Sequence, residues 1–180
     1  MIPLKEATSV KHKQAERMPF NIRMFKGLLS KSEYLFYINQ QLQVFKAIES
    51  VGLPHASLSR SANVQEDINE LNADGYYADF VLESTHAYAN YLKSLSRETI
   101  LPHVYLNYLA LIFGGQMIKN SVPSTGKMYE FENMNEAVQS IRMVQKDEWA
   151  DEVNKGFDFN IAIFEELETE CAKALLFNQS

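Results

Sequence analysis

The fold is indicated first by one stretch, His103-Val104-Tyr105-Leu106-Asn107-Tyr108-Leu109-Ala110-Leu111-Ile112-Phe113-Gly114-Gly115-Gln116. It has no acidic residue, lysine or arginine, its apolar residues recur at helical spacing, and it runs into two adjacent glycines. A glycine pair inside a helix costs about 2 kcal/mol of helix preference relative to alanine. Such pairs are usually kept for a kink or for close backbone approach. The stretch therefore predicts a buried helix that bends, or is closely approached, at Gly114 and Gly115.

The rest of the chain shows the same helical spacing. Its 180 residues include seven glycines and five prolines, and no long alternating β-branched stretch is visible. We expect helices at about Leu4–Met18, Ser30–Val51, Asn63–Leu71, Tyr76–Leu95, Leu101–Asn120, Asn133–Gln145 and Glu148–Phe177. Ser30 and Glu33 have the spacing of a capping box at the start of the second helix. The sequence therefore predicts a single all-α domain over residues 1–180.

Composition excludes several classes of function. A net charge of −6 argues against non-specific nucleic-acid binding. A single cysteine, Cys171, excludes an internal disulfide and cysteine-held zinc or iron–sulfur sites, and fits a reducing compartment. No apolar run reaches the roughly 20 residues that span a bilayer, and the first residues lack the pattern of a signal peptide. We therefore expect no membrane span and a cytoplasmic location.

A second informative segment is Leu4-Lys5-Glu6-Ala7-Thr8-Ser9-Val10-Lys11-His12-Lys13-Gln14-Ala15-Glu16. Several small residues lie on or beside the helical face of His12, so that a flat ring has room to approach it. A neutral imidazole is a good iron ligand, and a single histidine leaves the opposite position open for oxygen. Taken alone, such a histidine is more often structural or exposed.

Together, these two segments resemble the heme oxygenase family, and the likeness extends over nearly the whole chain. The resemblance implies an all-helical fold with heme between a proximal helix and a kinked distal helix. It also implies cleavage of heme to biliverdin, iron and carbon monoxide, with molecular oxygen as co-substrate and electrons from an external reductase, ferredoxin or flavodoxin. By resemblance, His12 is the axial iron ligand, and Lys5 and Tyr105 contact the heme propionates. Gly114 and Gly115 correspond to the distal-helix glycines on the oxygen side.

The chain departs from the family pattern on the distal helix. Members usually have Gly-Asp-x-Ser-Gly-Gly where this sequence has Ala110 through Gly115, so that Leu111 replaces the aspartate. That carboxylate supports a water network that delivers protons to the oxygen side of the heme, and leucine can neither hold water nor relay a proton. The family's basic pair farther along is not in register either. Arg142 and Lys146 lie close by, and either can form a charge-assisted bond to a propionate.

Two alternatives remain open from the sequence. Leu111 favours a heme-binding sensor, carrier or buffer that has lost ring cleavage. Glu83 and His86 form a Glu-x-x-His pair on one helical face, as in helical non-heme di-iron oxygenases. Such sites need that pair twice, and only one copy is present, so Glu49, Glu165 or Glu166 would have to complete it.

Overall fold

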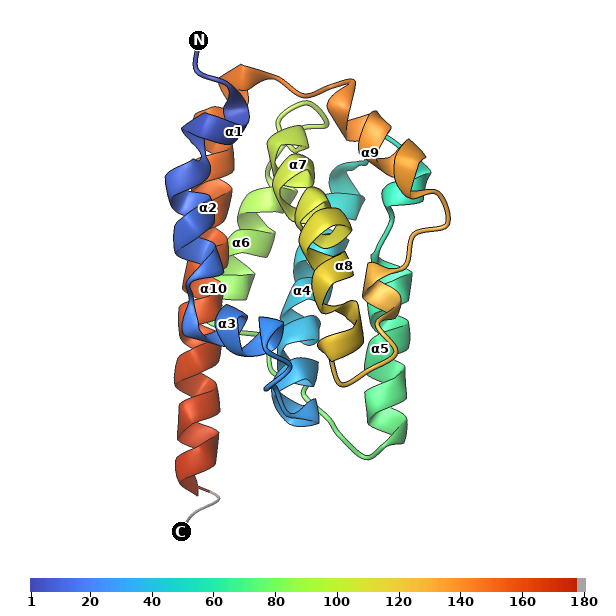
Figure 1. Cartoon of the computed structure of the whole chain (residues 1–180), viewed down its shortest axis with the longest axis vertical. Coiled ribbons are helices and arrows are strands. Elements are labelled where there is room, and N and C mark those ends of the chain that lie inside the picture. Colours follow the sequence, from blue (N-terminus) through green and yellow to red (C-terminus); the bar gives the residue numbers. More distant parts are fainter. Residues whose placement is uncertain (178–180) are drawn as a thin grey trace.

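The structure, a computed structural model, describes residues 1–177, with side chains described through Ala174. Helices make up most of the described chain, which contains no strand, and the prediction of a single all-α domain is confirmed (Figure 1). The longer helices are α2 (Ser9–Glu16), α4 (Lys31–Val51), α5 (Ser61–Ala73), α6 (Glu83–Lys93), α7 (Leu101–Leu109), α9 (Met134–Arg142) and α10 (Ala150–Phe177). Shorter segments are α1 (Leu4–Ala7), α3 (Pro19–Phe25), α8 (Gly115–Ile118), η1 (Ala56–Leu58), η2 (Ala110–Gly114), η3 (Lys119–Ser121), η4 (Lys127–Tyr129) and η5 (Asp147–Trp149).

Helix α4 is the centre of the hydrophobic core. The expected capping box begins it: the Ser30 hydroxyl accepts from the Glu33 N–H at 3.1 Å, and the Glu33 carboxylate accepts from the Ser30 N–H at 2.9 Å. Helices α5 and α6 pack on α4, and α10 runs along one edge of the molecule, where α2, α3, α6 and α7 pack on it (Figure 1). A smaller second core joins α1, α2, α7, η5 and α10. Helix α10 therefore holds the N-terminal helices and α7 in fixed positions.

The predicted helix Leu4–Met18 is interrupted. It divides at Thr8 into α1 and α2, and the Ala7 carbonyl accepts a hydrogen bond from the Asn154 side chain of α10 at 3.3 Å. A further short helix, α3, follows at once and begins with Pro19, which fits the first turn because it needs no N–H donor there.

The predicted helix Tyr76–Leu95 is wrong in its first turns. It begins at Glu83, because the backbone before it is bound by other elements. The buried Gln40 amide of α4 donates to the Phe80 carbonyl at 2.9 Å and accepts from the Leu82 N–H at 3.0 Å. The Glu166 carboxylate of α10 accepts from the first two N–H groups of α6. Contacts distant in sequence thus replace the helical hydrogen bonds that the apolar spacing predicts.

The predicted helix Leu101–Asn120 runs through the expected region but is not uniform. The five residues of η2 are π-helical, between α7 and α8. A π-helical insertion changes the direction of the side chains that follow it, and such insertions often mark functional sites. The remaining helices agree with their predicted positions to within three residues at each end, as far as they are described. Among the described residues, no helix is both long enough and apolar enough to cross a membrane.

Candidate functional site

His12 lies on α2 with its imidazole accessible. More than half of the side chain is exposed (57%), and its Nε2 lies 3.1 Å from a carboxylate oxygen of Glu16, one turn later. The ring stacks on Phe157 of α10, with 5.8 Å between the ring centroids and 28° between the planes. In a neutral imidazole, one nitrogen donates to the carboxylate and the other keeps its lone pair. His12 is therefore oriented from two sides and retains one nitrogen for a metal.

The surface next to this histidine is apolar and concave. A shallow cleft of about 230 Å³ lies between the end of α2 and α3, lined by Glu16, Ile22, Phe25 and Lys26. Ile22 and Phe25 are 37% and 40% exposed, although both are large hydrophobic residues. Exposed apolar side chains that line a hollow are typical of ligand sites rather than of ordinary surface.

The two glycines of the distal segment have different surroundings. A Cβ added to Gly114 would meet no atom within 4 Å, whereas one added to Gly115 would lie 2.4 Å from Cδ1 of Tyr129. Ala110 is exposed, and Phe113, 53% exposed, also faces outward from η2. The Gly114 side of η2 is thus open, while Gly115 is required for the close approach of a buried tyrosine.

Tyr129 is a residue whose role the sequence did not indicate. It belongs to η4, which is held by two buried charged side chains, Asp67 of α5 and Arg60 directly before that helix. Asp67 accepts from the Lys127 N–H at 3.0 Å and from the Met128 N–H at 2.8 Å, and Arg60 donates to the Met128 carbonyl at 3.2 Å. Burial raises the pKa of Asp67 despite these hydrogen bonds. The packing at Gly115 therefore depends on residues about fifty positions earlier in the chain, and no local pattern indicates this.

Leu111 faces the protein interior. Its side chain is buried in the main core, so this position of η2 presents no group to the open side. One turn earlier, the Asn107 amide donates to the Tyr88 hydroxyl at 3.0 Å and accepts from the Asn160 amide at 3.0 Å. A buried polar network therefore ends beside the position that Leu111 occupies.

That network continues to the surface through His103, which is fully buried. Its Nδ1 lies 2.8 Å from the Tyr88 hydroxyl, and its Nε2 lies 2.9 Å from the Glu152 carboxylate, which also accepts from Tyr91. Burial lowers the pKa of His103, against the opposing effect of Glu152. Burial alone would raise the pKa of Glu152, but the hydrogen bonds from Tyr91 and His103 lower it on balance. His103 thus joins α7 to α10.

Three of the residues expected at the propionates come to one end of the molecule. The Leu4 N–H donates to the Asp147 carboxylate at 2.8 Å, which brings α1, with the exposed Lys5, next to η5 and Lys146. Tyr105 packs edge-on against Trp149 of η5, with ring centroids 6.5 Å apart. Arg142 instead donates to Gln145 at 2.6 Å, and Lys146 lies 3.9 Å from Glu98. The segments that carry Lys5, Tyr105 and Lys146 thus meet at η5, whereas Arg142 has a local partner.

Sequence comparisons identify proteins that are similar to this chain. A sequence model described as heme oxygenase matches residues 2–166. This chain belongs to the heme oxygenase family. Relatives include the heme oxygenase of Guillardia theta, 26% identical, with 93% of this chain and 85% of that protein covered, and heme oxygenase 1 of Gallus gallus, 25% identical, with 95% and 70% covered.

Solved structures show the same fold. The heme complex of heme oxygenase-1 from Synechocystis superposes with a TM-score of 0.80 at 21% identity, covering 98% of this chain and 96% of that one. Heme oxygenase from Leptospira interrogans gives a TM-score of 0.77 at 23% identity, covering 91% and 97%. The expectation of a heme oxygenase-like helical fold is therefore confirmed.

The residues of this heme oxygenase family member fit a heme group. An exposed imidazole with a free nitrogen lies on α2, and η2 presents an open face at Gly114, where a Cβ would enter unfilled space. The di-iron alternative finds no support, because the described part of the chain gathers no group of three or more metal-ligating side chains. Its candidate carboxylates serve other roles: Glu49 accepts from the N–H groups of Arg60 and Ser61, and Glu166 caps α6.

Proposed function

We propose that this chain, as one domain over residues 1–180, binds heme and cleaves it to biliverdin, iron and carbon monoxide. The observation that carries the proposal is the presence of an exposed, carboxylate-oriented His12 on α2 together with an open π-helical segment at Gly114. Helix α2 packs on α10, and the π-helical segment continues α7, which also packs on α10. When bound, heme would supply the redox-active iron at which molecular oxygen reacts. Electrons would come from an external reductase, ferredoxin or flavodoxin, and the cytoplasm is the proposed location.

In this proposal each residue has a defined role. His12 holds the iron, and the Glu16 carboxylate, by accepting the N–H of the imidazole, strengthens it as a ligand and fixes its ring. Lys5 and Tyr105 orient the propionates, with Lys146 at the same end and Arg142 able to join them if it leaves Gln145. Gly114 and Gly115 together form the oxygen-side wall. Gly114 faces open space, whereas the α-carbon of Gly115 packs on Tyr129.

A second function is favoured by one observation. The buried Leu111 places no proton-carrying group on the oxygen side, and the neighbouring Asn107 amide is not an acid. A heme-binding protein that senses, carries or buffers heme without cleaving it would need no such group. Heme binding is common to both functions, and turnover distinguishes them.

The experiment is reconstitution with hemin, followed by a chemical or enzymatic reductant in air with catalase present to remove free peroxide. Loss of the Soret band and formation of biliverdin, confirmed by mass, supports heme cleavage. A Soret band that persists without bilin formation supports the non-cleaving function.

Ligation is tested separately with His12→Ala and a matched control. His86→Ala removes an exposed histidine of α6 that lies outside the proposed site. His12→Ala should abolish or strongly shift the heme spectrum, whereas His86→Ala should leave it unchanged. An unchanged spectrum in His12→Ala contradicts the ligand assignment.

A further inference from the structure

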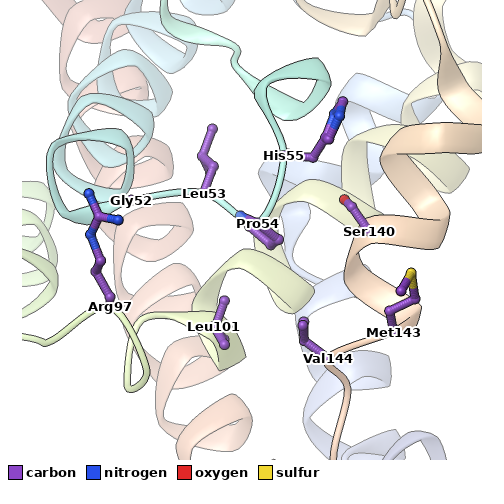
Figure 2. Close-up of a pocket in the computed structure, with 9 residues that line it drawn as sticks. All are labelled: Gly52, Leu53, Pro54, His55, Arg97, Leu101, Ser140, Met143 and Val144. Carbon is purple, nitrogen blue, oxygen red and sulfur yellow. The ribbon is translucent and has the colours of Figure 1, made fainter.

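A larger cleft lies among elements that do not carry His12 or the distal glycines. Its volume is about 400 Å³, within the range of small-molecule sites. It is lined by the loop after α4, by the turn before α7, by the first residue of α7 and by the last turn of α9 with the residues that follow it (Figure 2). None of its lining residues belongs to the proposed heme site.

One end of the cleft is formed by the exposed side chain of Arg97, which lies against the backbone at Gly52. Gly52 has φ +146°, a conformation that other residues rarely adopt. A Cβ placed on it would lie 3.6 Å from both Cγ and Nε of Arg97, so the arginine side chain lies against the bare glycine backbone. Figure 2 shows the Arg97 side chain extending toward Gly52 from the turn before α7. The absence of a side chain at Gly52 thus leaves room for the arginine at this end of the cleft.

Arg97 carries the one charge of the lining that has no counter-ion. In the described part of the chain its guanidinium makes no hydrogen bond or ion pair, whereas Arg23 pairs with two carboxylates. His55, at the other end, is fully engaged: its Nδ1 accepts from the Ser57 N–H at 3.1 Å, and its Nε2 lies 3.2 Å from the Glu136 carboxylate. A single cation beside the cleft is complementary to a single anionic group.

Between these ends the surface is mostly apolar. Leu53, Pro54, Leu101, Met143 and Val144 form the wall, and Met143 is 84% exposed. A flexible, exposed methionine adapts to a flat apolar partner. The space between Arg97 and His55 therefore suits a ligand that is apolar over most of its surface and carries its charge at one edge.

We propose that this cleft is a second ligand site, which binds a small amphipathic monocarboxylate with its carboxylate on Arg97 and its apolar body against Leu101 and Val144. Heme itself fits the cleft poorly, because one cation is present for two propionates and both nitrogens of His55 are already engaged. The site is independent of the proposed heme site.

The test is a titration of the heme-free protein with 2-naphthoate, followed by amide chemical shifts in ¹H–¹⁵N NMR spectra. We expect saturable shifts centred on Gly52, Leu101 and Val144. The uncharged 2-naphthalenemethanol should bind clearly more weakly. Equal binding of the two compounds, or shifts scattered over the surface, would overturn the proposal, as would the absence of saturable shifts.

Two variants locate the contacts. Arg97→Gln keeps the stem of the side chain and removes the charge, and it should weaken naphthoate binding by about two- to fivefold, as expected for an exposed ion pair. Lys93→Gln is the matched control, since it removes an exposed positive charge on α6 outside the cleft. Val144→Trp should block binding by filling the apolar part. If Arg97→Gln binds naphthoate as tightly as the unsubstituted protein does, the assignment of the carboxylate to Arg97 is refuted.

A final titration in the presence of one equivalent of hemin tests independence. Unchanged naphthoate affinity supports a separate site, and loss of binding would show that the cleft belongs to the heme site and overturn the proposal. Failure of hemin to bind at all would contradict the proposed function, while the naphthoate result in heme-free protein would still stand.

Discussion

The contact between Gly115 and Tyr129 gives the sharpest test of how the distal segment is built. In Gly115→Ala, the new methyl group would lie 2.4 Å from Cδ1 and 2.9 Å from Cε1 of the tyrosine ring. Carbon atoms pack at about 3.5–4.0 Å, so the ring would have to retreat by about 1 Å. Tyr129 is 1% exposed, and its carbonyl accepts from Gln116 at 2.7 Å, so little room is available.

The expected loss of stability is estimated by comparison with Gly114→Ala, whose methyl group would meet no atom within 4 Å. Both substitutions gain up to about 1 kcal/mol of helix preference, and this gain largely cancels between them. Overpacking of a rigid core costs about 1–3 kcal/mol. Gly115→Ala should therefore be less stable than Gly114→Ala by about 1–3 kcal/mol.

The assay is urea unfolding of the heme-free proteins, followed by circular dichroism, with equal m-values required for the comparison. Tyr129→Leu provides the second arm of a double-mutant cycle, because it removes the ring from the position of the clash. The buried Tyr129 hydroxyl faces that of Tyr34, so the cost of Tyr129→Leu alone is measured and subtracted in the cycle. Equal stability of the two alanine variants, or no coupling between positions 115 and 129, would refute the packing argument.

Three further predictions concern other parts of the structure. The pKa of His103 is lowered in the folded protein, so the unfolded chain binds a proton at higher pH than the folded protein does. The free energy of unfolding should therefore fall as the pH decreases below about 6.5, by at most about 1.4 kcal/mol per pH unit for this group. Urea unfolding at several pH values should show a weaker dependence of this free energy on pH in His103→Gln. Asp67→Asn places an amide where one carboxylate oxygen accepts a backbone N–H, and should cost about 1–3 kcal/mol of unfolding free energy, unlike the exposed control Asp79→Asn. Glu16→Gln should weaken hemin binding about 10- to 100-fold without loss of helix content, and an unchanged hemin affinity would show that Glu16 does not act on the ligand histidine.

The helices are the part of the structure that the sequence predicts best. Helix α4 has its capping box and apolar stripe in the sequence itself, and the structure has both. The glycine pair can be identified locally as a break in helix preference, whereas the role expected of His12 rests on the family resemblance and stays a prediction. The start of α6 could not be predicted, since Gln40 and Glu166 bind its backbone from two other helices.

The sequence by itself determined the all-α class, the family and the residues that the proposed function uses. Only the tertiary structure decided what surrounds those residues. Gly114 faces open space and Gly115 faces Tyr129, although they are adjacent and identical in the sequence. The physical reason is that helix preference is set by neighbours along the chain, whereas close approach is set by whatever the fold packs across from a residue. The same reason leaves Arg97 without a counter-ion in one cleft while Arg23 is paired between two carboxylates.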